Sequence, residues 1–179
     1  MTVTQPVRGM TIKLIDEILW LPQQLFAKEI TNEIAAHYPK ETGGMLLGYV
    51  NGTHRVVTAL IGAGPDAKHE KHRMVPDDHY QQKRLLEHFE KTDGTESFLG
   101  EWHSHPEALP DMSRTDRRTL HNVTVNSQNL LTLPIMLIVG VYPNEKRCVL
   151  KAYRSQSARR RLRLKESDFL EIHVEWFTA

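Results

Sequence analysis

Residues 97–116 read SFLGEWHSHPEALPDMSRTD and combine a strand pattern, a loop and a helix start. The stretch 97–103 predicts a strand. Because side chains alternate between the two faces of a strand, His103 and His105 should point the same way, with Ser104 on the other face. Pro106 cannot donate to a sheet ladder, so we expect the chain to leave the sheet there. Two imidazoles are therefore expected to face one point at a strand end.

A helix is expected to begin soon after this strand. Ser113 and Asp116 have the spacing of a capping box, which would place Asp116 in the first helical turn. Two histidines and one carboxylate are an established ligand set for catalytic zinc, which keeps its fourth position for water. The alternative is that Ser113 and Asp116 only cap the helix, and that His103 and His105 are ordinary, partly buried side chains. The complete combination favours a metal site.

The same residues carry a family resemblance. The pattern His-Ser-His-Pro at 103–106, six residues, and then Ser-x-x-Asp at 113–116 resembles the motif of the JAMM or MPN+ metallopeptidases. In that family a distant glutamate precedes the motif, and the segment ETGGMLLG at 41–48 is similar to the one that carries it. The resemblance extends from about Glu41 to Val141. It implies a Zn²⁺ ion bound by His103, His105 and Asp116, with Glu41 as the general base and Ser113 as a stabiliser of the tetrahedral intermediate.

Glu101 is a second candidate for the proton-transfer role. It lies two residues before His103, so strand alternation places it on the same face as both histidines. The family pattern favours Glu41, whereas a general base must in any case lie within hydrogen-bond reach of its proton. Otherwise Glu41 is a solvated loop residue, and Glu101 is a carboxylate that orients a ligating histidine. Ser113 likewise has two possible tasks, helix capping and hydrogen bonding to an oxyanion.

Composition limits the other interpretations. With 179 residues, a formal charge of +1 and 40% hydrophobic residues, the chain suits one soluble domain over residues 1–179. Its one cysteine, Cys148, cannot build internal disulfides and is expected to be a small buried hydrophobe. The sequence shows no signal-peptide pattern and no apolar run of about 20 residues. We therefore expect a cytoplasmic protein that does not contact a membrane.

Helix and strand patterns alternate along the chain and predict an α/β or α+β fold, with a mixed central sheet flanked by helices. The resemblance implies a JAMM/MPN-type domain of this class. Residues 62–75 are expected to be a loop. The expected helices are 22–37, 76–91 and a third after Ser113, and the expected strands are 10–20, 44–50 with 55–61 as a hairpin, 97–103, and 134–142 as a buried central strand with 147–153 as its hairpin neighbour.

Three further segments are weighed by their charge and periodicity. Lys68–Arg73, which contains His69 and His72, could contact a substrate or a partner, but its charge favours a solvated loop. Arg159–Lys165 is basic, but acids elsewhere and the lack of interleaved aromatics favour a solvated face or an acidic protein partner over nucleic acid. The alternating residues of the C-terminal segment predict an edge strand or a docking segment, with core packing as the default: Leu170, Ile172, Val174 and Trp176.

The resemblance implies a zinc-dependent isopeptidase that hydrolyses the amide after the C-terminus of a conjugated, ubiquitin-like protein. The stretch GEWHSHP at 100–106 is most similar to bacterial deconjugases of CBASS anti-phage operons, which release a cGAS-like nucleotidyltransferase from the proteins joined to it. Two alternatives stay open: a peptidase that trims ubiquitin-like sulfur-carrier precursors, and a non-catalytic MPN scaffold. A scaffold has no chemical need for the whole residue set. A zinc deaminase needs a Pro-Cys-x-x-Cys element, which one cysteine cannot supply.

Overall fold

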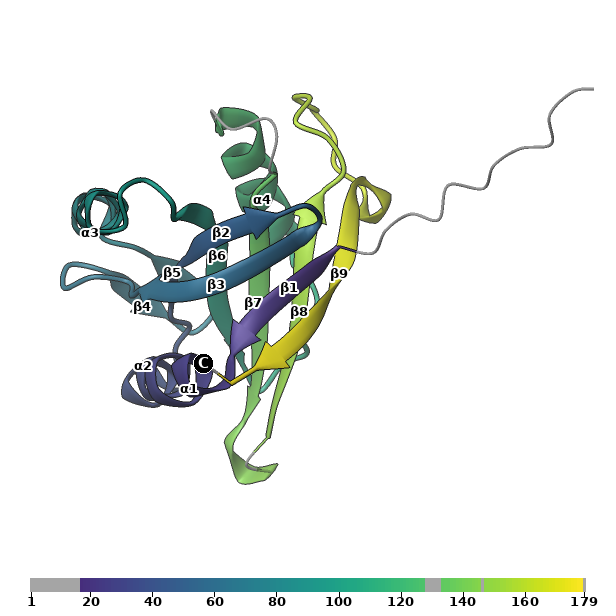
Figure 1. Cartoon of the computed structure of the whole chain (residues 1–179). Helices are drawn as coiled ribbons and strands as arrows, with labels where there is room; N and C mark the ends of the chain where they lie inside the picture. The colour runs from purple at the N-terminus through teal and green to yellow at the C-terminus, as the bar shows by residue number, and fades with distance from the viewer. Residues whose placement is uncertain (1–16, 128–132, 146, 179) are drawn as a thin grey trace, which may run out of the picture.

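The computed structural model describes residues 17–127, 133–145 and 147–178. Its main sheet is a closed barrel, and a separate two-stranded sheet lies beside it (Figure 1). The order around the barrel is β1 (Ile18–Pro22), β3 (His54–Ile61), β2 (Gly43–Asn51), β6 (Ser97–Pro106), β7 (Ile135–Tyr142), β8 (Arg147–Ser155) and β9 (Phe169–Phe177). β1 closes the ring because it pairs in parallel with both β3 and β9.

The barrel encloses the main hydrophobic core. Its inward side chains include Leu19, Leu46 and Leu137, all with no exposed surface. Strand β7 is apolar throughout because both of its faces are buried: Leu137 points into the barrel, whereas Met136 and Ile138 belong to an outer cluster. A strand buried on both faces reads as a continuous hydrophobic run rather than an alternating one. This confirms the prediction that 134–142 is a buried central strand.

Four α-helices flank the barrel in the described residues. The first segment comprises α1 (Gln23–Leu25), a π-helical turn (Phe26–Ile30) and α2 (Thr31–His37). Helix α3 (Asp78–Lys91) packs against β3 and β6, and α4 (Arg114–Asn126) packs against β8. Figure 1 shows α2 and α3 on one side of the barrel, with α4 apart from them. The predicted mixed sheet with flanking helices is thus confirmed, and its closure into a barrel is the added finding.

Several predicted elements differ from the structure, mainly in where they begin or end. Residues 62–75 contain a β-hairpin, β4 (Lys68–Glu70) and β5 (Arg73–Val75), rather than only a loop. β1 begins at Ile18, and residues 10–16 of the expected first strand lie outside the described residues. β6 continues through Pro106, which still lies opposite Val141 in parallel register. A proline is tolerated there because β2 pairs with β6 only as far as His103, so the missing N–H of Pro106 breaks no bond between these strands.

The C-terminal segment is a barrel strand and not an edge strand. β9 pairs with β8 on one side and with β1 on the other. Ile172 is buried in the core, whereas Leu170 and Trp176 keep 40% and 37% of their surface exposed. Trp176 also makes an edge-to-face contact with Phe26. Among the described residues, Cys148 is partly buried against the inner core as a free thiol, and no helix is long and apolar enough to span a membrane.

Candidate metal and catalytic site

Pairing of β2 with β6 brings the two halves of the motif together. Gly43 lies opposite His103 in an antiparallel register. Beyond the last pair, the Ser104 N–H donates to the Thr42 carbonyl at 2.8 Å, and the Thr42 N–H donates to Ser104 Oγ at 3.0 Å. Glu41 comes directly before this pair, and its N–H donates to the Glu70 carbonyl at 2.9 Å. Ser104 is fully buried, which confirms that it faces away from the histidines.

The Gly43–Gly44 pair permits this close approach of strands. A Cβ atom added to Gly43 would lie 2.2 Å from the Trp102 carbonyl oxygen, and one on Gly44 would lie 1.9 Å from the Ile61 carbonyl oxygen. Both distances are far below van der Waals contact, so any side chain would push β2 away from a neighbouring strand. The two glycines therefore fix the position of Glu41 relative to the histidines.

The imidazoles of His103 and His105 meet the carboxylate of Asp116 at one point. The two Nε2 atoms are 3.0 Å apart, and they lie 3.4 Å and 3.5 Å from the nearest Asp116 oxygens. The three side chains are only 11–13% exposed. A tetrahedral zinc ion with ligand bonds of about 2.0–2.1 Å separates its ligand atoms by about 3.3 Å. Donor types and spacing therefore fit a single metal ion.

Ser113 and Asp116 form the predicted capping box at the start of α4. Ser113 Oγ accepts from the Asp116 N–H at 3.1 Å, and the Ser113 N–H donates to Asp116 Oδ2 at 2.6 Å. Asp116 therefore caps the helix and faces the histidines at once, so capping is not an alternative to ligation. Capping uses an acceptor lone pair of the Ser113 hydroxyl, and its O–H remains able to donate.

Hydrogen bonds around the ligands set their protonation. The Leu109 carbonyl can only accept, so His105 Nδ1, at 3.1 Å, carries the proton and leaves Nε2 free for a metal. Burial alone would raise the pKa of Asp116, but hydrogen bonds from His103 and His105 outweigh it and hold that pKa well below its usual range. Burial alone would lower the pKa of His105, whereas Asp116 and the Leu109 carbonyl raise it. The carboxylate is thus ionised and ready to ligate.

The structure distinguishes between Glu41 and Glu101, the two glutamates that are candidates for proton transfer. Burial raises the pKa of Glu41 to about 7, with His105 lowering it and Asp116 raising it. The charges of His105 and Asp116 thus act directly on the Glu41 carboxyl group. Burial also raises the pKa of Glu101 to about 6, but its charged neighbour is Asp78 on α3. A general base works best with a pKa near the working pH and close to the reacting group. Both criteria favour Glu41.

Glu41 is expected to cost stability at neutral pH in the metal-stripped protein. Its pKa is about 7 when folded against an ordinary value of 4.5, so folding takes up a proton between these values. Stability therefore falls as pH rises through this interval, and the whole penalty is present above 7. Glu41→Gln should be more stable than wild type at pH 8, by on the order of 2 kcal/mol after solvent screening of this partly exposed group, and equally stable near pH 4. Urea unfolding at both pH values measures this, and equal stability at pH 8 would contradict the buried, protonatable Glu41.

Ser113→Ala is expected to change stability and rate separately. Loss of the cap should cost about 1 kcal/mol of unfolding free energy. Loss of the O–H donor should lower kcat about a hundredfold if it binds the oxyanion. Ser113→Thr keeps both functions and serves as the matched control. Urea unfolding and hydrolysis rates of both variants give the comparison, and a stability loss without a rate loss would leave Ser113 a helix cap only.

Several contacts around Glu41 were not predicted from the sequence. The Lys68–Arg73 segment was expected to be solvated, yet His69 Nδ1 lies 3.0 Å from the Glu41 carbonyl oxygen. The Tyr38 hydroxyl also donates to the Glu107 carboxylate at 2.7 Å and links the chain before Glu41 to the loop after His105. No local pattern signals these contacts, because each joins residues far apart in sequence.

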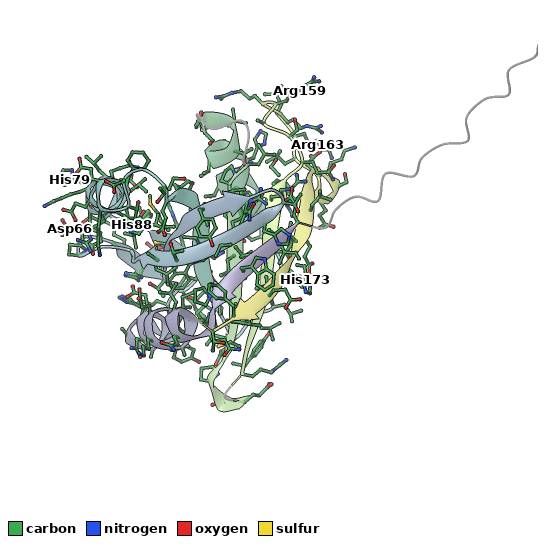
Figure 2. The ribbon with its side chains drawn as sticks, viewed as in Figure 1. Asp66, His79, His88, Arg159, Arg163 and His173 are labelled. Carbon is green, nitrogen blue, oxygen red and sulfur yellow. The ribbon has the colours of Figure 1, made fainter. Side chains whose placement is uncertain are left out.

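The basic segment 159–165 lies away from these residues, in the connection between β8 and β9. Arg159 and Arg163 project outward from it (Figure 2). Its charge is partly compensated close by, since Arg161 pairs with Asp168 at 2.6 Å. This exposure agrees with a solvated face. A role in binding an acidic protein stays a prediction.

Known proteins are similar to this chain in sequence and in fold. A family of prokaryotic homologues of the JAB domain matches residues 23–157. The CD-NTase/cGAS isopeptidase of Vibrio cholerae is 36% identical over 58% of this chain and 64% of its own length, and the one of Escherichia coli is 32% identical over 58% and 65%. A probable metalloprotease of Sinorhizobium fredii is 25% identical over 69% and 76%. The chain thus spans just under two thirds of the matched isopeptidases.

Similarity of fold extends to a Desulfitobacterium hafniense protein whose solution structure is known. The two structures superpose with a TM-score of 0.62 at 18% sequence identity. The superposition covers 90% of this chain and 94% of the other. The family match includes most of the barrel, with strands β2 and β6, and helix α4. The resemblance drawn from the motif is confirmed, and the chain belongs to the prokaryotic JAB-domain family.

Proposed function

We propose that this protein is a zinc-dependent isopeptidase that hydrolyses the amide after the C-terminus of a conjugated protein. One observation carries the proposal: His103, His105 and Asp116 converge at 3.0–3.5 Å while the neighbouring Glu41 has its pKa raised to about 7. A metal site and a poised carboxylate are the two parts that hydrolysis of an unactivated amide needs. The names of the relatives, a probable metalloprotease and an isopeptidase, support the same reaction.

The side chains divide the chemistry among them. When bound, a zinc ion supplies a water nucleophile that is active at neutral pH and polarises the scissile carbonyl. Glu41 accepts the proton of that water and returns it to the departing amine, since a carboxyl group with a pKa of about 7 exchanges protons readily in both directions. The Ser113 O–H donates to the oxyanion that develops on the carbonyl. The Leu109 carbonyl keeps the His105 ring in the tautomer that binds metal.

The substrate we propose is a cGAS-like nucleotidyltransferase joined through its C-terminal carboxyl group to another protein. This rests on the relatives from Vibrio cholerae and Escherichia coli, both named CD-NTase/cGAS isopeptidases, at 36% and 32% identity. It would place the enzyme in an anti-phage system, where it reverses conjugation. The complete set of ligands and base disfavours a scaffold without catalysis.

Cleavage of matched substrates tests the proposal. One substrate joins the C-terminal carboxyl of a CD-NTase to a lysine side chain, and the other joins the same C-terminal sequence to the backbone amine of the same acceptor. We expect the zinc-loaded protein to release the CD-NTase from the isopeptide substrate, with the linear fusion cleaved more slowly. Faster cleavage of the linear bond would instead favour precursor processing, and cleavage of neither would contradict this substrate.

A further inference from the structure

A second group of metal-ligating side chains lies behind the segment that carries Glu41. Glu33 and His37 are one helical turn apart on α2, and His69 is the central residue of β4. One possible ligand atom of each residue lies within 4.8 Å of those of the other two. These donors, two imidazoles and one carboxylate, are of the same types as those of the His103 site.

Helix α2 places the first two donors. Residues four apart lie on the same side of a helix, and His37 Nε2 is 3.5 Å from Glu33 Oε1. This distance is close to the spacing of about 3.3 Å between neighbouring ligand atoms of a tetrahedral zinc ion. The Thr42 hydroxyl donates to the same Glu33 oxygen at 3.0 Å and fixes the orientation of the carboxylate. The hydrogen bond from Thr42 therefore holds the Glu33–His37 pair in an arrangement that suits metal ligation.

The backbone of Glu41 orients His69. Its Nδ1 atom lies 3.0 Å from the Glu41 carbonyl oxygen, which can only accept a hydrogen bond. Nδ1 therefore carries the proton, and Nε2 is the nitrogen left to bind a metal. Metal-ligating histidines usually donate their second ring N–H to a carbonyl or carboxylate in this way. His69 already has this supporting hydrogen bond.

The two imidazoles stack on each other with ring centroids 3.7 Å apart and planes 15° apart. Two positively charged rings at this distance would repel each other. Burial and the charge of His69 lower the pKa of His37, whereas Glu33 raises it. A shared ion requires one ring to turn out of the stack.

Space for an ion and a water is present at the cluster. Glu33, His37 and His69 line a groove of about 600 Å³ together with Tyr80 and residues of the 62–67 loop. A zinc ion with three protein ligands takes its fourth ligand from water, and this groove is large enough to hold one.

We propose that Glu33, His37 and His69 bind a divalent transition-metal ion, with Zn²⁺ as the best fit, at a second site separate from the catalytic one. Imidazole donors suit zinc and its first-row neighbours, whereas Mg²⁺ and Ca²⁺ prefer oxygen ligands. The ion ties α2 to β4 across residues 41–42, since Glu33 holds the Thr42 side chain and His69 holds the Glu41 carbonyl. Its role is to position the segment that carries Glu41.

Zinc counting on the full chain tests the second site. Metal-stripped protein is dialysed against buffered, micromolar free zinc, and bound zinc is measured by atomic emission. Wild type should hold two ions per chain, and His37→Gln and His69→Gln should each hold one. His72→Gln is the matched control, because this exposed histidine belongs to the same hairpin connection and is not part of the cluster. It should still hold two.

Crossed variants separate the two sites. His103→Ala should hold one zinc ion, and the double variant His103→Ala/His37→Gln should hold none. A single ion in wild type that disappears in His103→Ala overturns the second site and leaves the proposed catalysis intact. Two ions in a folded His37→Gln or His69→Gln protein overturn it as well. The two substitutions lie on different elements, so circular dichroism identifies a folding failure of one, and the other then decides.

Discussion

Glu41→Gln should lower the rate of isopeptide hydrolysis by a factor of about 10² to 10⁴ while zinc at the catalytic site stays bound. The amide of glutamine has nearly the shape of the carboxylate but cannot accept and return a proton. Burial and the neighbouring Asp116 raise the pKa of Glu41 to about 7, so the wild-type group is near-optimal for this exchange at neutral pH. Single-turnover cleavage with zinc content measured on the same preparation gives both values.

Glu101→Gln is the control for this experiment. Glu101 lies on β6, the strand that carries His103 and His105, and its pKa is also raised. The charged neighbour of Glu101 is Asp78, which is not one of the proposed metal ligands. Removing the Glu101 charge should therefore change the rate by less than about tenfold. If Glu101→Gln is inactive and Glu41→Gln keeps its activity, the general base is Glu101. The expected order of the two variants would then be reversed.

His105→Ala and Asp116→Ala should each lose the catalytic metal together with all measurable hydrolysis. Each removes one of three ligands that converge at 3.0–3.5 Å, and two remaining ligands hold zinc far more weakly than three. Asp116→Ala also removes half of the capping box, so an added loss of about 1 kcal/mol in unfolding free energy is expected. Zinc content, hydrolysis and urea unfolding are measured for both.

His173→Ala provides a control for general loss of a histidine. His173 lies on the outer side of β9 (Figure 2), where its ring contacts Glu175. Zinc content and hydrolysis should match wild type. Full activity in a His105→Ala protein, or equal zinc loss in His173→Ala, would contradict the assignment of the ligands.

The parts of the fold that depend on local signals could be predicted from the sequence. The capping box at Ser113 and the apolar run of β7 define their elements without help from distant residues. Closure of the barrel could not be predicted, because the parallel pairing of β1 with β9 joins residues more than 150 positions apart. The β4–β5 hairpin was missed because its strands have only three residues each, too few to show an apolar alternation.

The candidate site divides in the same way. Strand alternation predicted that His103 and His105 share a face, and capping geometry placed Asp116 in the first turn of α4. Only the family resemblance selected Glu41, since its closeness to His105 depends on the pairing of β2 with β6. The cluster of Glu33, His37 and His69 gave no sequence signal, because it joins a helix to a hairpin about 30 residues away. Contacts between segments far apart in sequence are the missing information in both cases.

Removal and return of the metal tests the central claim most directly. The wild-type protein is stripped with a chelator, assayed on the CD-NTase isopeptide conjugate, and assayed again as zinc is added stepwise. Cleavage should vanish in the stripped protein and return with added zinc, with no such return in Asp116→Ala. Undiminished cleavage by fully stripped protein would contradict a metallo-isopeptidase.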